Sequence, residues 1–136
     1  MKTHTALTWV CGAAAVILAG SVLLSIISQD KSMEICIGTY GDNLYIYEFD
    51  TEDLEFRQKG HYEADNPSYA LYKDGHIYAV SETGPESGLY SFDKHGSKTA
   101  GLLQTGADPC FIMTYGNHVM TADYSGGSVS VFPTEN

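Results

Sequence analysis

A repeat of 42 residues is the feature that most limits what this chain can fold into. When the sequence of 136 residues is shifted by 42 positions, two segments align, one around a proline and one within an apolar run: Asn66–Tyr69 with Asp108–Phe111, and His76–Ser81 with His118–Asp123. The residues Tyr40, Glu82 and Tyr124 are spaced by the same 42 positions, each at the end of a predicted strand. Self-similarity at such a period indicates a repeated supersecondary unit.

Each repeat holds about four short strands. Runs rich in Tyr, Ile, Val and Phe alternate with Gly, Asp, Asn and Ser, which is typical of strands joined by turns. The predicted strands are 34–40, 44–50, 55–62, 68–72, 76–81, 88–93, 99–105, 110–114, 118–123 and 128–132. A period of 40–45 residues with four strands is typical of a propeller blade. We therefore expect an all-β fold, a β-propeller with about two four-stranded blades; a β-sandwich with similar turn spacing is the alternative.

Two blades cannot close a propeller. Each blade covers its sheet faces with its neighbours, so an open pair leaves two apolar faces in water. At least four blades are typical, which would need about 160 residues or more at this repeat length. We expect residues 34–136 to be a partial β-propeller, from a truncated product or part of a longer chain, that folds poorly alone.

The first 33 residues have a different character. No charged residue occurs from Thr5 to Ser28, Lys2 precedes this stretch, and Asp30 and Lys31 follow it. An apolar run of this length predicts a hydrophobic helix, a signal peptide or a transmembrane anchor over residues 6–28. Either one places the rest of the protein on the periplasmic or extracellular side. A buried soluble helix and a start at Met33, which would make the protein cytoplasmic, remain as alternatives.

Composition excludes several classes of function. Residues 34–136 contain 16 acidic and 5 basic residues, a net charge of −11, which repels nucleic acid. Cys36 and Cys110 fall within predicted strands, where we expect them to be small buried side chains rather than ligands. We find no zinc spacing, phosphate loop or nucleophile elbow, and we expect neither a metal nor a cofactor.

Six segments in order carry a resemblance to a known family: Ile37–Tyr40, Leu44–Asp50, Asn66–Tyr69, Ile77–Glu82, Gly106–Cys110 and Ala122–Pro133. They resemble the start of the 6-phosphogluconolactonase-type lactonases, which are seven-bladed β-propellers. The resemblance implies that residues 34–136 are the first two blades. It also implies that the full-length form binds a small-molecule lactone at the mouth of its central channel, and hydrolyses a sugar lactone such as 6-phosphogluconolactone.

One position departs from the family pattern. After the Pro109-Cys110 pair the family usually has histidine, and this chain has Phe111. A phenyl ring neither donates nor accepts a proton, so it cannot replace a histidine that binds or polarises substrate. We therefore expect this chain by itself to be inactive, and a non-catalytic propeller that serves as a binding scaffold, exported or membrane-anchored, is the alternative function.

The catalytic residues are unknown from the sequence, but three residues are candidates for lining the channel or contacting substrate: Tyr40, Glu82 and Tyr124. Lactone hydrolysis needs a base for water and a donor for the developing oxyanion, and Glu82 could be that base. A solvated loop carboxylate and tyrosines packed between blades are the structural alternatives. Asn66 and Asp108, each before a proline, are expected to cap the turns that enter the blades.

Overall fold

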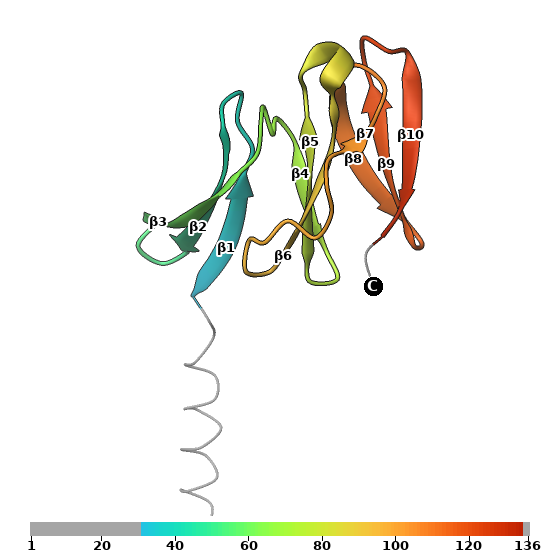
Figure 1. Cartoon of the computed structure of the whole chain (residues 1–136). Coiled ribbons are helices and arrows are strands. Elements are labelled where there is room, and N and C mark those ends of the chain that lie inside the picture. Colours follow the sequence, from blue (N-terminus) through green and yellow to red (C-terminus); the bar gives the residue numbers. More distant parts are fainter. Residues whose placement is uncertain (1–30, 135–136) are drawn as a thin grey trace, which may run out of the picture. The chain divides into compact units, whose positions relative to one another are not determined.

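The computed structural model describes residues 31–134, and these residues form ten strands (Figure 1). They are β1 (Ser32–Ile37), β2 (Asn43–Asp50), β3 (Phe56–Glu63), β4 (Ala70–Lys73), β5 (His76–Ser81), β6 (Gly88–Asp93), β7 (Leu103–Gln104), β8 (Pro109–Tyr115), β9 (His118–Asp123) and β10 (Ser128–Pro133). One short 3-10 helix, η1 (Gly84–Glu86), lies between β5 and β6. The predicted all-β class is confirmed for this part of the chain, and nine of the ten predicted strands are found close to their predicted bounds.

The strands are distributed over three sheets, which corrects the prediction of about two four-stranded blades. The orders are β1-β2-β3, β4-β5-β6-β7 and β8-β9-β10, and every described pairing is antiparallel. Only the second of these sheets has four strands among the described residues. The period in the sequence does not reveal this division, because it counts strands and does not say where one sheet ends and the next begins.

The positions of Tyr40, Glu82 and Tyr124 relate the three sheets to one another. Glu82 follows β5, the second strand of its sheet, and Tyr124 follows β9, also a second strand. Tyr40 comes soon after β1, so β1 is equivalent to β5 and β9 although it is the first strand of its sheet. Within the described residues, the first sheet therefore lacks an equivalent of β4, and the third lacks an equivalent of β7.

Two apolar cores hold the sheets together. Leu44 and Ile46 of β2 meet Ile77, Ala79 and Phe92 in the core between the first and second sheets. The alternate residues Tyr78 and Val80 of β5 lie in a second core, shared with the third sheet. Strand β5 is buried on both faces because successive side chains of a strand point to opposite sides.

The second core is completed by Leu89 of β6 together with Ile112 and Val119 of the third sheet. Contacts between sheets join β1 with β4, and β8 with both β4 and β5. The second sheet therefore contacts the first sheet through β4, and the third sheet through both β4 and β5.

The two outward faces of the three sheets are apolar and exposed. On the third sheet, Phe111 and Val129 flank Ala122, and Met113 and Val131 flank Met120 on the same face. On the first sheet, Met33, Phe49 and Phe56 form a similar row, and both Met33 and Phe56 are exposed. The expectation that an incomplete propeller exposes two apolar faces is confirmed for the described residues.

Two local predictions differ from the structure. The predicted strand 99–105 is reduced to β7, because Lys98 makes only an isolated bridge to Phe92 and the following residues run as bends. Strand β1 begins at Ser32, two residues before the predicted start of the propeller. At the other end of this strand, Gly38 lies directly against the Pro67 carbonyl, a separation that leaves no room for a Cβ atom.

The predicted hydrophobic helix over residues 6–28 lies outside the described residues, and the signal peptide or anchor stays a prediction. In the part of the chain that the structure describes, no helix has the length and the apolar character needed to span a membrane.

Candidate functional site

The three candidate residues follow equivalent strands at the same end of the sheets. Figure 1 shows the β1–β2, β5–β6 and β9–β10 connections at the upper end and the β4–β5 and β8–β9 turns at the lower end. Tyr40, Glu82 and Tyr124 belong to the upper connections. The segments that enter the second and third sheets, with Asn66 and Asp108, also reach this end. Equal spacing along the sequence thus corresponds to equivalent places in space.

Tyr40 and Glu82 form a contact between neighbouring sheets. A hydrogen bond with the Glu82 carboxylate, and then the charge of that carboxylate, raise the pKa of Tyr40, while the nearby Ser68 hydroxyl acts in the opposite direction. The phenol therefore stays protonated at neutral pH and can donate a hydrogen bond. Because the Tyr40 side chain is 76% exposed, the contact lies open to a ligand from solvent.

Two buried oxygen atoms next to Tyr40 lack a partner. Among the described residues, Ser68 Oγ and Glu82 Oε2 are shielded from solvent and have no partner at full hydrogen-bond geometry. The Ser68 side chain is close enough to Tyr40 to lower its pKa, although Ser68 Oγ has no hydrogen-bond partner among the described residues. A buried polar atom without a partner is costly, so a donor supplied by a ligand would be favourable at Glu82.

Two further residues beside the Tyr40–Glu82 contact, Ser68 and Cys110, are not predicted from the sequence; together the four residues are called the Tyr40–Glu82 cluster. Ser68 belongs to an aligned segment but is not a predicted site residue. Cys110, predicted to be a small buried side chain, is exposed and lies close enough to Tyr40 to contribute to its raised pKa. A break in register between Pro109 and Phe111 displaces Cys110 from the regular alternation of β8.

The Phe111 ring is 44% exposed and lies 5.5 Å from the Tyr69 ring, measured between centroids. The only sequence signal for the Tyr69–Phe111 pair is that each ring stands two positions after a proline of the repeat.

Tyr124 does not join the cluster. Its side chain is 81% exposed, and no described interaction links its ring to Tyr40 or Glu82. Its backbone N–H donates to the Asp108 carbonyl at 2.8 Å, so the loop itself is held. The structure thus brings together two of the three candidates, and their role in binding or catalysis stays a prediction.

The Asp123 carboxylate stabilises this end of the third sheet through hydrogen bonds. Its buried carboxylate accepts hydrogen bonds from Thr121 Oγ1 at 2.7 Å, Ser130 Oγ at 2.7 Å, Ser128 Oγ at 3.0 Å and the Gly106 N–H at 3.1 Å. Burial raises the pKa of Asp123, but these hydrogen bonds outweigh burial and leave the pKa below its usual value. The ionised group fixes the segment that leads to Asp108.

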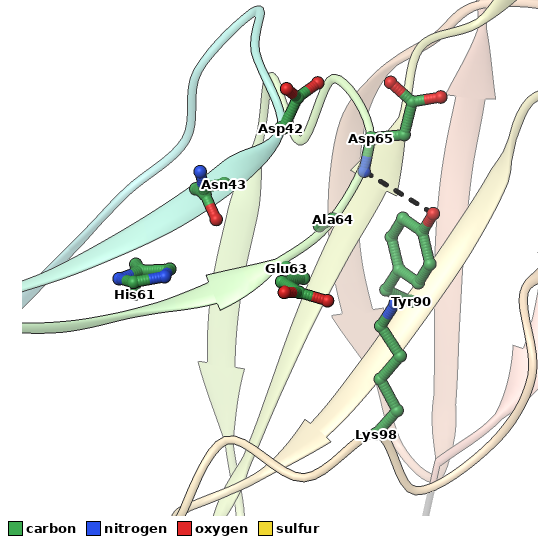
Figure 2. A pocket seen from close by; sticks show the side chains of 8 residues that line it. All are labelled: Asp42, Asn43, His61, Glu63, Ala64, Asp65, Tyr90 and Lys98. Carbon is green, nitrogen blue, oxygen red and sulfur yellow. Dashed lines mark hydrogen bonds between the residues drawn. The ribbon is translucent and has the colours of Figure 1, made fainter.

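An open cleft lies between the first two sheets, and Figure 2 shows the residues that line it. This cleft of about 450 Å³ is open to solvent and polar, with the side chains of Asp42, Asn43, His61, Glu63, Asp65, Tyr90 and Lys98 around it. The Lys98 ammonium lies 4.7 Å from the Tyr90 ring centroid, and the Asp65 N–H donates to the Tyr90 hydroxyl at 3.5 Å. The cleft contains none of the three predicted site residues.

Metal-binding side chains are not clustered in the described part of the chain. Within residues 31–134, no three His, Cys, Asp or Glu side chains come together in a way that could hold one. The phenol and the carboxylate at the Tyr40–Glu82 contact can form hydrogen bonds and transfer protons.

Comparison with known proteins identifies the fold. The family described as Lactonase, 7-bladed beta-propeller, matches residues 34–136. A crystal structure of a candidate 6-phosphogluconolactonase from Bacteroides fragilis NCTC 9343 has 32% identity and a TM-score of 0.66, with 78% of this chain and 33% of that chain covered. One from Bacteroides uniformis ATCC 8492 has 35% identity and a TM-score of 0.67, with coverages of 79% and 35%. A search of curated proteins returned no match.

The chain spans about one third of the length of these two structures. The family match covers most of the sequence and includes all ten described strands except the first two residues of β1. The resemblance found from the aligned segments is confirmed, and the chain belongs to the lactonase family of seven-bladed β-propellers.

Proposed function

We propose that the full-length protein hydrolyses a sugar lactone such as 6-phosphogluconolactone, and that residues 34–136 supply one part of the site and are inactive alone. Family membership and the two similar candidate 6-phosphogluconolactonases support the reaction class. The observation that carries the assignment of residues is the Glu82 carboxylate, which raises the pKa of the Tyr40 phenol and has Oε2 buried without a partner.

The two groups have complementary roles in this proposal. Hydrolysis of a lactone requires a base that takes a proton from water and a donor that stabilises the oxyanion formed at the carbonyl. Glu82 accepts a proton from the attacking water or a hydrogen bond from a substrate hydroxyl. Tyr40, whose pKa is raised, remains protonated and donates. The exposed position of Tyr40 gives a substrate direct access to the phenol.

The described cations lie away from this end of the sheets. They precede β1, lie in the first half of β3, or belong to the β4–β5 turn and the β6–β7 connection: Lys31, Arg57, Lys59, Lys73, Lys94 and Lys98. Arg57 and Lys59 are paired with Glu48. A substrate phosphate placed near Glu82 would therefore need cations from residues other than 31–134. This supports the proposal that the segment has no activity of its own.

The proposal is tested with the full-length protein and with residues 34–136, each assayed by acid release from 6-phosphogluconolactone and from glucono-1,5-lactone. We expect the full-length protein to exceed spontaneous hydrolysis of at least one lactone, and the segment to match the rate without enzyme. A full-length protein inactive on both lactones would contradict the proposal and favour the binding scaffold.

The scaffold alternative rests on Phe111, whose ring contacts Tyr69 where the family pattern usually has histidine. We expect Phe111→His in the full-length protein to raise kcat/KM for its preferred lactone by about 10-fold, because an imidazole restores a group that can bind or polarise the substrate. Phe111→Leu is the matched control, since it removes the ring without adding a proton donor. Equal rates for Phe111→His and Phe111→Leu would show that an imidazole at this position does not contribute to lactone hydrolysis.

A further inference from the structure

We propose that Asn66 and Asp108 are positioning residues that hold the loops of Tyr40, Glu82 and Tyr124 in a fixed relation across the three sheets. This inference rests on the proposed function only for its effect on catalysis. The contacts that carry it are hydrogen bonds between described residues.

Asn66 and Asp108 are equivalent in backbone conformation as well as in sequence. Each lies in a segment that enters a new sheet, directly before Pro67 or Pro109, and has a positive φ, 43° for Asn66 and 53° for Asp108. Asn and Asp are enriched among non-glycine residues in this left-handed region. The conformation directs the main chain and the side chain of one residue toward two different loops.

Asn66 joins the loop of Tyr40 to Glu82. Its N–H donates to the Gly41 carbonyl at 2.8 Å, next to Tyr40. Its carbonyl accepts the Glu82 N–H at 3.1 Å, and its side-chain Nδ2 donates to the Glu82 carbonyl at 3.3 Å. Both backbone polar groups of Glu82 are thus bound to this one residue.

Asp108 repeats the arrangement one sheet further on. Its Oδ1 accepts the Gly84 N–H at 2.6 Å, and its own N–H donates to Ser87 Oγ at 3.1 Å, so it holds the loop that follows Glu82 at two points. Its carbonyl accepts the Tyr124 N–H at 2.8 Å. The Glu82 loop is consequently held by Asn66 from one side and by Asp108 from the other.

This arrangement decides where the Glu82 carboxylate lies relative to Tyr40, because the two residues belong to different sheets and no described backbone hydrogen bond joins them directly. A displacement of about 1 Å at a reacting group can reduce the rate by about 100-fold. A residue that holds both loops therefore affects the reaction without touching the substrate.

The test compares Asp108→Gly and Asp108→Asn in the full-length protein. Glycine keeps the positive φ and removes the acceptor for Gly84, whereas asparagine keeps an oxygen in its place. Asp74→Gly is the matched control, because Asp74 also has a positive φ (50°) and lies in the β4–β5 turn at the opposite end of the sheet. The readouts are the pKa of Tyr40, followed by NMR of labelled tyrosine rings with Tyr40→Phe for assignment, and kcat/KM.

We expect Asp108→Gly to return the pKa of Tyr40 toward the ordinary tyrosine value of about 10 and to reduce kcat/KM by about 10-fold or more. Asp108→Asn and Asp74→Gly should leave the pKa of Tyr40 near that of the parent. If Asp108→Gly does not fold, Asn66→Gly, which loses only the Nδ2 contact, should move the pKa of Tyr40 in the same direction by a smaller amount.

An unchanged pKa of Tyr40 in Asp108→Gly, or in Asn66→Gly where Asp108→Gly does not fold, would overturn the positioning role. Equal shifts in Asp108→Gly and Asp74→Gly would overturn it too. The titration does not depend on catalysis. A protein without lactonase activity would therefore refute the proposed function, while the pKa of Tyr40 would still decide the role of Asp108.

Discussion

We expect Glu82→Gln to reduce kcat of the full-length protein for its lactone by about 100-fold or more, the lower end of what general acid–base catalysis contributes. Glutamine has nearly the same shape, but its amide cannot take a proton from water. Folding should be little affected, because the backbone of Glu82 keeps its hydrogen bonds to Asn66. The measurement is steady-state lactone hydrolysis, followed as acid release across pH.

Glu86→Gln provides a matched control for this prediction. Glu86 lies in η1 of the same loop, is exposed, and has the same charge as Glu82. Glu82→Gln should also return the pKa of Tyr40 toward its ordinary value, because the Glu82 carboxylate is the first cause of the raised value. Similar rate losses in both variants would show that Glu82 contributes only general loop charge.

The second large effect is expected on stability. Asp123→Ala should lower the free energy of unfolding by about 3 kcal/mol, because removing a buried acceptor leaves hydrogen-bond donors unsatisfied. Asp123 is 2% exposed and accepts four hydrogen bonds, including that of the Gly106 N–H. Urea unfolding of the full-length protein at neutral pH measures the change. Asp53→Ala, at an exposed aspartate of the β2–β3 turn, is the control and should cost far less.

The stabilisation from Asp123 should also depend on pH. Its pKa in the folded protein lies below the ordinary value near 3.8, so its contribution is fully present above that pH and is lost as the pH falls through the lowered value. Asp93 has a lowered pKa as well, from the Ser97 and His95 backbone hydrogen bonds, and adds to acid sensitivity. Asp123→Ala should therefore flatten, but not abolish, the loss of stability as the pH falls below about 4. An unchanged slope would contradict an ionised Asp123 network.

The strands of this protein are predictable because their signals are local. Alternating apolar residues and turn residues such as Gly75 and Gly116, both of which have positive φ, mark each strand and each hairpin. The fold class and the family follow from the same segments. The division into sheets is not predictable in this way, since pairing joins residues that are distant in the sequence; Leu103 pairs with Leu89, but residues 99–102 do not continue that strand.

The candidate site, like the fold, could be predicted from the sequence only in part. The 42-residue spacing selected Tyr40, Glu82 and Tyr124 as equivalent, but equivalence does not make them neighbours. Tyr40 and Glu82 meet because the first two sheets share a core around Leu44 and Phe92, while Tyr124 remains in solvent.

By itself, then, the sequence determined the all-β class of residues 31–134, nearly all of their strands, the repeat and the family, because each depends on patterns within a few residues or on the period between them. Only the tertiary structure decided that three sheets are present, that Cys110 is exposed beside a register break, and that Ser68 and Glu82 have buried oxygens without partners. These features arise where separate sheets pack against each other. Burial and hydrogen-bond geometry at such places depend on the whole set of contacts and not on any one segment.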